Sequence, residues 1–530
     1  MTLKELTIKE KKEKSLKHSI KDGCGWATMV GFGENYISPF AIALNATNQQ
    51  IALLASIPQL LSSLFQLIAA KITDLVKNRK KIILYGVLIQ ALIWLPLFYI
   101  PFITKNIYFL IAFVSVYFIA GSFGAPAWNS WMGELVEEDK RGKYFGFRNK
   151  IMGFFTVVSI SLAGFILSKF KQVNVFYGFG IIFMIGLIAR AFSTFYIKKM
   201  YEPQYIVEKK DYFSFVDFVK KMRKTNYGIF VLFMFFLRFS VFVAGPFFAV
   251  YMLRDLNFSY MTYTIVTVTA TIITFITMTY WGKYADRFGN RNILTITSYL
   301  VPLAPILWLF STNIVYLIFI QIFTGFIWAG FELSAANFIF DTVKPKNRAK
   351  CVSYYNVFNG LGMFFGSMVG GALALKLVKP SFLMSSLQLL FLISGILRLF
   401  VVLYFIPKIK EVRVIQHMPE GELLVRAVAI DPIRGIAYEG ITGMKTIGDI
   451  GKKGIVAGVK AVEIIVKDTE QMIGEITEKA KEISIKEGRR RAMEKKKLVR
   501  EFEEFVHDLV PKKKGKKEKP KKTKRETKKL

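Results

Sequence analysis

The stretch "WGKYADRFGNRN" (residues 281–292) separates two long apolar runs in a chain that is 53% hydrophobic. A related stretch, "AAKITDLVKNRK" (residues 69–80), occurs 212 residues earlier and aligns with it without gaps. The alignment pairs Asp74 with Asp286, Asn78 with Asn290 and Arg79 with Arg291. A repeat at this distance indicates a chain made of two similar halves.

Other matches keep the same order and nearly the same offset. "RGKYFGFRNKIMG" (141–153) aligns with "RAKCVSYYNVFNG" (348–360). Asn129 and Arg190 correspond to Asn337 and Arg398, each 208 residues later. Together these matches predict two repeated six-helix bundles, the architecture from which alternating-access carriers are built.

The length of the apolar runs predicts the fold class. The 530 residues have a mean hydropathy of +0.37. Runs of about 20 apolar residues recur, which is the length a helix needs to cross a hydrocarbon core of roughly 30 Å. We therefore predict an all-α polytopic membrane protein with about twelve transmembrane helices. The predicted spans are 23–46, 50–74, 82–103, 106–132, 149–169, 174–197, 228–252, 260–282, 293–311, 313–341, 351–375 and 382–406.

These spans define six predicted regions. They are a cytoplasmic N-terminus (1–22), a first bundle (23–197), a cytoplasmic linker (198–227), a second bundle (228–407), an amphipathic helical region (408–511) and a disordered Lys-rich tail (512–530). The gaps after the second, fourth, eighth and tenth spans are rich in Lys and Arg, whereas the gaps on the other side hold few. By the positive-inside rule, both termini are cytoplasmic in a multi-pass protein of the plasma membrane.

Several classes of function have no support in the sequence. Cys24 and Cys351 lie far apart, and the three histidines lie outside the apolar runs. We therefore expect no metal site and no cofactor, and we do not expect an enzyme. Without a P-loop, direct ATP hydrolysis is not expected.

The segments "GKYADRFGNR", "EEDKRGKYFGFRN" and "KPKNRAKCVSYYN" carry a resemblance to the major facilitator superfamily, over roughly residues 20 to 407. The resemblance implies secondary transport of a small solute by two rocking bundles. The second copy of the first motif predicts a tight glycine turn at Gly289, where the first copy has Lys77.

The resemblance also implies a cytoplasmic gate. In this family an acid after the second or eighth helix lies against the start of a helix in the other bundle. Such a carboxylate gains from nearby cations and from the helix N-terminus. Simple anchoring of topology is the alternative for an isolated Lys or Arg. The predicted gate residues are Asp74, Arg79, Asp286, Arg287, Arg291, Arg141 and Arg348.

Three charges lie midway along predicted spans, namely Glu34, Arg238 and Glu332. Such residues cost about 2.5 to 3.5 kcal/mol on insertion scales and point to function. The resemblance places their helices around a central cavity, where either acid could pair with Arg238 and couple proton to solute movement. A permanent structural ion pair is the alternative. Further candidates for contact with solute are Asn129, Asn337 and Tyr354. Arg190 and Arg398 are interpreted as structural, by snorkelling or packing.

Prolines and glycines predict local features of the helices. Pro39 and Pro246 predict breaks in the first and seventh spans. Gly362, Gly366 and Gly370 predict close contact of the eleventh span with another helix.

Two functions remain open on the sequence alone. The first is a carrier of a small solute, with H⁺ as a possible coupling ion. The second is a non-transporting sensor or scaffold that acts through its cytoplasmic tail. The basic tail suggests contact with anionic lipids of the bilayer, and no nucleic-acid partner is expected.

Overall fold

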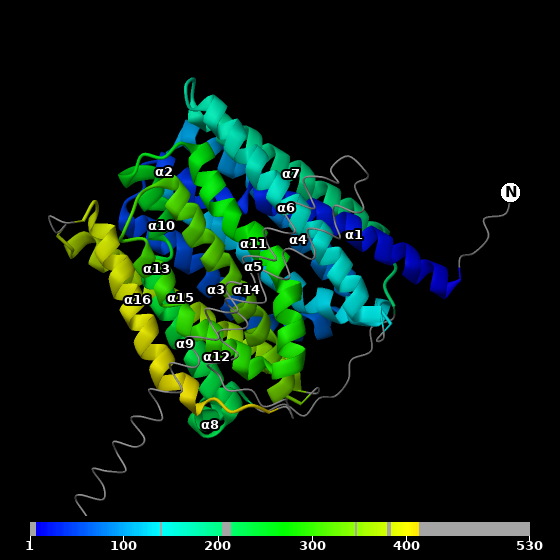
Figure 1. Cartoon of the computed structure of the whole chain (residues 1–530). Helices are drawn as coiled ribbons and strands as arrows, with labels where there is room; N and C mark the ends of the chain where they lie inside the picture. Colours follow the sequence, from blue (N-terminus) through cyan, green and yellow to red (C-terminus); the bar gives the residue numbers. More distant parts are fainter. Residues whose placement is uncertain (1–6, 138–139, 204–213, 345–346, 379–382, 413–530) are drawn as a thin grey trace, which may run out of the picture. The chain divides into compact units, whose positions relative to one another are not determined.

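A computed structural model describes residues 7–137, 140–203, 214–344, 347–378 and 383–412. All regular structure in these ranges is helical (Figure 1), which confirms the predicted fold class. The predictions for the region from 413 to 511 and for the tail from 512 to 530 lie outside the described residues. So does the middle of the predicted linker, 204–213.

The helices follow one another through two halves of the chain. The first half contains α1 (Ile8–Phe32), a 3₁₀ turn (Glu34–Tyr36), α2 (Ile37–Ala43), α3 (Asn48–Val76), α4 (Arg79–Ile103), α5 (Ile107–Leu135), α6 (Arg141–Phe170) and α7 (Val175–Lys199). The second half contains α8 (Phe215–Lys221), a 3₁₀ turn (Met222–Lys224), α9 (Asn226–Ala244), α10 (Phe247–Val250), a π turn (Tyr251–Asp255), α11 (Tyr260–Phe288), α12 (Asn290–Leu300), α13 (Leu303–Leu307), α14 (Ile314–Thr342), α15 (Arg348–Lys376) and α16 (Ser386–Phe405).

Within the described residues, ten helical segments are long and apolar enough to cross a membrane. The other two predicted spans are the first and the ninth, and each is divided into shorter helices. The first breaks between Phe32 and Ile37, and the seventh bends at Gly245 and Pro246, so both predicted breaks are confirmed. The ninth span breaks between Leu300 and Leu303. Pro302 opens the second piece there, and a proline has no N–H for the helix.

The junctions after α3 and α11 are both tight turns. Gly289 has a φ of 85°, in the region that favours glycine, as predicted. Lys77 occupies the corresponding place with a φ of 53°. The left-handed conformation is therefore adopted by a residue with a side chain in the first repeat. Asn78 follows it and accepts a hydrogen bond from the backbone N–H of Lys81, which caps α4.

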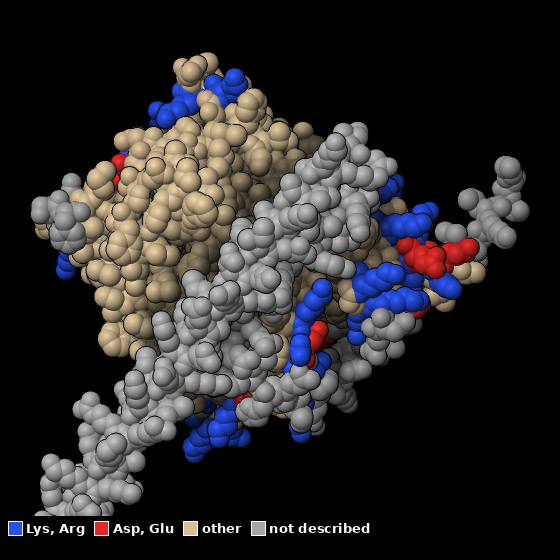
Figure 2. All heavy atoms as spheres, in the orientation of Figure 1, with Lys and Arg blue, Asp and Glu red and all other residues tan. Residues whose placement is uncertain are grey.

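Charge is concentrated at the helix ends. We call the end formed by the last turns of α3, α5, α11 and α14 the basic end, and the opposite end the far end. On the face drawn in Figure 2, Lys and Arg gather mainly around the start of α1 and around α8, at the basic end. Large apolar side chains lie exposed on the helices between the ends, among them Phe154, Phe319 and Phe400. A broad exposed apolar surface of this kind fits a lipid environment.

Small residues let the helices approach closely. A Cβ on Gly362, Gly366 or Gly370 would lie 2.2 to 2.5 Å from a backbone oxygen of α9, so the predicted close contact of this span is confirmed. Between the halves, α3 packs along α15 and α6 packs along α11. A Cβ on Gly371 would lie 2.9 Å from the Cβ of Ala52, and one on Gly164 would overlap Thr264.

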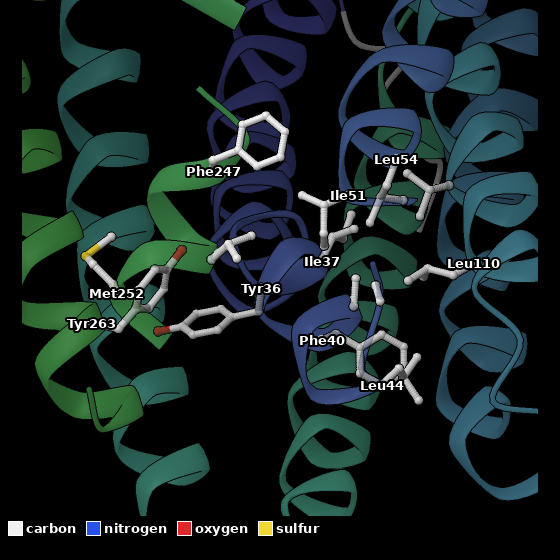
Figure 3. Packing of buried hydrophobic residues seen from close by; sticks show 14 of the residues in the cluster. Tyr36, Ile37, Phe40, Leu44, Ile51, Leu54, Leu110, Phe247, Met252 and Tyr263 are labelled. Atoms are coloured by element: carbon white, nitrogen blue, oxygen red, sulfur yellow. The ribbon is translucent and has the colours of Figure 1, made fainter. Parts of the chain in front are cut away.

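A buried apolar cluster joins the two halves at the far end. Figure 3 shows Tyr36 of the first half beside Tyr263 of the second. The same cluster contains Ile37 and Phe40 of the first half and Phe247 and Met252 of the second. The rings of Tyr36 and Tyr263 meet edge to face, with their centroids 6.5 Å apart. The hydroxyl of Tyr36 donates to the carbonyl of Ile160 and lies 2.7 Å from the hydroxyl of Thr264. Both halves therefore share one core at this end.

Candidate functional site

A cavity of about 490 Å³ lies between the halves. Asn35 and Ser38 line it from the first half, and residues of α9, α11, α13, α14 and α16 line it from the second. Its volume falls in the range of small-molecule sites. The break between α12 and α13 contributes directly, because Ala304, Pro305 and Trp308 form part of the wall.

Arg238 lines this cavity and forms an ion pair with Glu332. Nη2 of Arg238 on α9 lies 2.5 Å from Oε1 of Glu332 on α14. The arginine side chain is 13% exposed and the glutamate side chain 44% exposed. The guanidinium also lies 5.7 Å from the ring centroid of Trp328. Of the two acids predicted as partners of Arg238, Glu332 is therefore the one in contact.

Glu34 lies in the 3₁₀ turn where the first span breaks. Its carboxylate accepts a hydrogen bond from the hydroxyl of Tyr117 on α5, in the same half. No Lys or Arg of the described residues lies within ion-pair distance of Glu34. Asn35, the next residue, lines the cavity. The broken helix thus places the carboxyl group of Glu34 against a neutral partner of the first half, one residue along the chain from the cavity wall.

The structure does not bring the other predicted candidates to this cavity. Asn129 is exposed on α5 and lines a separate cavity of about 320 Å³ inside the first half. Asn337 lies one and a half turns beyond Glu332 on α14 and is absent from the cavity lining. Tyr354 is buried on α15, where its ring packs against Phe215 and Phe218 at 5.1 and 5.4 Å. Aromatic packing accounts for this tyrosine.

The predicted gate residue Arg79 is fully buried inside the first half. Its guanidinium makes a bidentate contact with Glu134 on α5, at 2.5 and 2.9 Å. Glu202, just after α7, accepts a hydrogen bond from the backbone N–H of Arg79 at 2.7 Å. This position differs from the expected contact with the other half, because two acids of its own half reach the arginine.

The second half repeats this arrangement at the basic end. The backbone N–H of Arg291 donates to Glu411 after α16, and the side chain of Asn290 donates to Asp341 on α14. None of the four acids in these two arrangements was predicted from the sequence. A signal was present, because Glu202 and Glu411 lie 209 residues apart and Glu134 and Asp341 lie 207 apart. These spacings match the offset of the repeat.

The remaining predicted gate residues lie at the basic end. Asp74 is partly buried, whereas Asp286 and Arg287 are exposed. Arg141 donates to the carbonyl of Gly133, and Arg348 to the carbonyls of Val343 and Phe340. These hydrogen bonds fix each arginine beside the helix that precedes it.

Arg190 and Arg398 are buried rather than directed toward the membrane surface. Arg190 on α7 donates to Gln90 and to Ser193, and the hydroxyl of Ser193 donates to Asp22. Asp22 also pairs with Arg148 at 3.4 Å. This polar group of the first half was not predicted from the sequence, because Asp22 lies at the start of an apolar run. Arg398 lines the cavity between the halves.

Two repeated helical halves with a cavity between them are the architecture of a membrane transporter. The sequence matches the Major Facilitator Superfamily over residues 25–243 and 230–434. The chain therefore belongs to this family of small-solute transporters, as the resemblance implied. No curated protein matches the sequence significantly.

Solved structures show the same fold at low sequence identity. A variant of the nucleoside transporter NupG is 14% identical, with a TM-score of 0.61 over 76% of this chain and 100% of its own. The xylose transporter XylE from E. coli is 10% identical, with a TM-score of 0.56 over 77% and 99%. A bacterial homologue of the human lysosomal transporter Spinster, in an inward-facing and unoccupied conformation, is 14% identical, with a TM-score of 0.54 over 75% and 96%.

Proposed function

We propose that this protein moves a small organic solute across the plasma membrane by alternating access, coupled to protons. The cavity between the halves carries the proposal, because residues of both halves line it while a shared core closes the far end. A solute held there would change sides if the far end opened and the basic end closed. By the positive-inside rule, the basic end is cytoplasmic.

Opening the far end would break a small set of contacts between the halves. Arg254 donates to the carbonyl of Ala46 at 2.6 Å and to the side chain of Asn48 at 3.1 Å. The hydroxyls of Tyr36 and Thr264 would also separate. These few polar contacts and the apolar cluster hold the far end closed. A bound solute would shift the equilibrium between this closed state and an open one.

At the basic end, the exposed acid Asp286 and the partly buried Asp74 are proposed to close the opposite state. Each would pair with cations near the start of α6 or α15, such as Arg141 or Arg348. Arg287 and Arg291 would belong to the same basic surface. Arg79 is left out of the gate, because it is buried among acids of its own half.

We assign proton coupling to Glu34 rather than to Glu332. Glu332 has a fixed cationic partner in Arg238, so its charge is compensated. Glu34 has the hydroxyl of Tyr117 as its partner, and the next residue along the chain, Asn35, lines the cavity. A carboxyl group with a neutral partner can change protonation when its access to water changes.

A reversible cross-link at the far end tests alternating access. Ala52→Cys and Gly371→Cys would place two thiols on α3 and α15, where the Cβ atoms need to separate by about 1 Å for a relaxed disulfide. The background would carry Cys24→Ala and Cys351→Ala. Purified protein in vesicles would be assayed for solute flux down a gradient and for acidification-driven uptake.

We expect oxidation to abolish flux in the double-cysteine protein and a reductant to restore it. Each single-cysteine variant should keep its flux under oxidation. Full flux in the cross-linked protein would refute alternating access through the far end. Uptake that is unchanged by a pH gradient, and unchanged in Glu34→Gln, would refute the proton coupling alone.

A further inference from the structure

Arg398 is a buried cation without a nearby carboxylate. Its side chain lines the cavity between the halves, and the residue is 3% exposed. Nη1 donates to the carbonyl oxygen of Val301 at 3.3 Å, and Nε has no partner among the described residues. No described Asp or Glu lies within ion-pair distance of it.

The broken ninth span explains the hydrogen bond from Arg398 to the carbonyl of Val301. In a continuous helix, the carbonyl of Val301 would accept from the backbone of residue 305. That residue is Pro305, which has no N–H. The carbonyl is therefore left for the guanidinium, and the same break forms the adjoining wall of the cavity.

The repeat offers an internal comparison. Arg190 corresponds to Arg398 and is surrounded by Gln90, Ser193 and, through Ser193, Asp22. At the local offsets of 212 and 208, Gln90 corresponds to Pro302 and Ser193 to Val401.

The acid has no counterpart either. Helix α9 occupies the place of α1 in the second half and contains no Asp or Glu. The second half has therefore kept the buried arginine without the polar partners that neutralise it in the first.

The other charges of the cavity cancel. Arg238 is paired with Glu332, and no acid of the described residues lines the cavity. Among the lining residues this leaves one positive charge, that of Arg398; the carboxylate of Glu34 is not in the wall and contacts Tyr117 of the first half. A buried uncompensated charge is unfavourable, so an anionic ligand would gain by neutralising it. A carboxylate carries one charge and matches the guanidinium fork, whereas a phosphate monoester would bring nearly two.

The rest of the wall indicates the body of the ligand. Phe248, Trp308 and Trp328 present aromatic surface to the cavity. The hydroxyl of Thr324, also in the wall, is buried without a partner among the described residues. These groups suit an apolar or aromatic skeleton with one hydrogen-bonding substituent.

We propose that the cavity binds an organic monocarboxylate whose carboxylate pairs with Arg398. This inference rests on the proposed carrier function and names its substrate class. Arg238 and Glu332 would then act as a neutral pair in the wall, and Arg398 would select the charge of the solute.

Matched acids and amides test the proposal on the full-length protein in detergent. The probes are benzoate with benzamide, nicotinate with nicotinamide, and indole-3-acetate with indole-3-acetamide, alongside the neutral solutes uridine and xylose. Binding would be measured by calorimetry and by thermal stabilisation. The variants are Arg398→Gln, Arg398→Lys and, in the first half, Arg190→Lys.

We expect at least one acid to bind the wild-type protein about tenfold or more tightly than its amide, as a charge-assisted hydrogen bond implies. Arg398→Gln should remove that preference, Arg398→Lys should keep part of it, and Arg190→Lys should keep all of it. Because Arg398 has no acid to leave unpaired, Arg398→Gln should unfold no earlier than the wild type without ligand.

Three results would overturn the inference, and they can be distinguished from one another. If uridine or xylose binds and no acid is preferred over its amide, the carrier function stands and the monocarboxylate site is wrong. If an acid is preferred equally in Arg398→Gln, the site lies elsewhere. If vesicles show no flux of any probe, the proposed function fails, and this inference fails with it.

Discussion

Replacing Arg79 by Gln should destabilise the protein more than the same change at Arg291, its counterpart in the repeat. Arg79 is fully buried and contacts Glu134 and Glu202. Arg291 is partly exposed, so water screens its charge. Comparing the two substitutions thus measures the effect of burial on two related sets of ionic contacts.

The magnitude follows from what each substitution leaves behind. Breaking a buried ion pair by removing one partner costs about 3 to 5 kcal/mol. The side chain of Glu134 is 43% exposed and would regain water, whereas that of Glu202 is 16% exposed and would not. We therefore take the lower limit, about 3 kcal/mol. For a folded unit of about 400 residues the entropy of unfolding is about 0.8 kcal/mol per kelvin, so Tm should fall by about 4 °C.

Thermal unfolding of the purified protein, followed by tryptophan fluorescence, would measure this shift. Arg291→Gln should lower Tm by less than half as much. Glu134→Gln should also have a small effect, because Arg79 would keep Glu202. Equal shifts for Arg79→Gln and Arg291→Gln would show that burial of the ion pair does not determine its contribution, and the reasoning would be wrong.

Two further predictions concern α1 and α15. His18 lies in the polar first part of α1, and burial together with three neighbouring lysines holds its pKa below the ordinary range. These lysines are Lys14, Lys21 and Lys199. Because the unfolded state binds the proton more readily, the stability of the protein should fall as pH drops through about 6.5. His18→Gln should make this fall smaller, as measured by Tm between pH 8 and pH 5. In Gly366→Ala, the added Cβ would lie 2.2 Å from the carbonyl oxygen of Phe239. Overpacking of this kind costs about 1 to 3 kcal/mol, so Tm should fall by about 1 to 4 °C. Gly282→Ala is the matched control, since its Cβ would meet its nearest neighbour at 3.9 Å, and equal shifts for the two would contradict the packing argument.

Hydropathy predicted most spans of the fold well, and its errors have physical causes. The tenth span was predicted at 313–341 and is Ile314–Thr342. The eighth was predicted to end at 282, but the helix continues to Phe288. A charged turn ends the membrane segment without ending the helix, so hydropathy stops too early. The first helix begins at Ile8, because Thr7 and Glu10 form a capping box before the apolar run.

The candidate site was less accessible from sequence. The three charges inside spans were found, but their pairing was left open, because nothing local decides whether Glu34 or Glu332 meets Arg238. The break near Pro302 was missed, although two prolines three residues apart were visible there. The partners of Arg79 were missed because they lie 55 and 123 residues away in sequence. Only the offset of the repeat links such distant residues.

Comparing the two halves separates architecture from function. At the basic end both halves place an acid after their last helix against the start of their third, through Glu202 and Glu411. Both halves must fold in the same way, so a contact that occurs in both is best explained by a role in folding. A substrate is asymmetric, so the side chains that bind it need to occur in one half only. Among the described residues, the carboxyl of Glu34, the pair of Arg238 with Glu332, and the unneutralised Arg398 have no matching contacts in the opposite half. Arg238 and Arg398 line the cavity between the halves, and Glu34 precedes Asn35, which also lines it. Polar groups that break the symmetry of the repeat are therefore the ones to test first for solute binding.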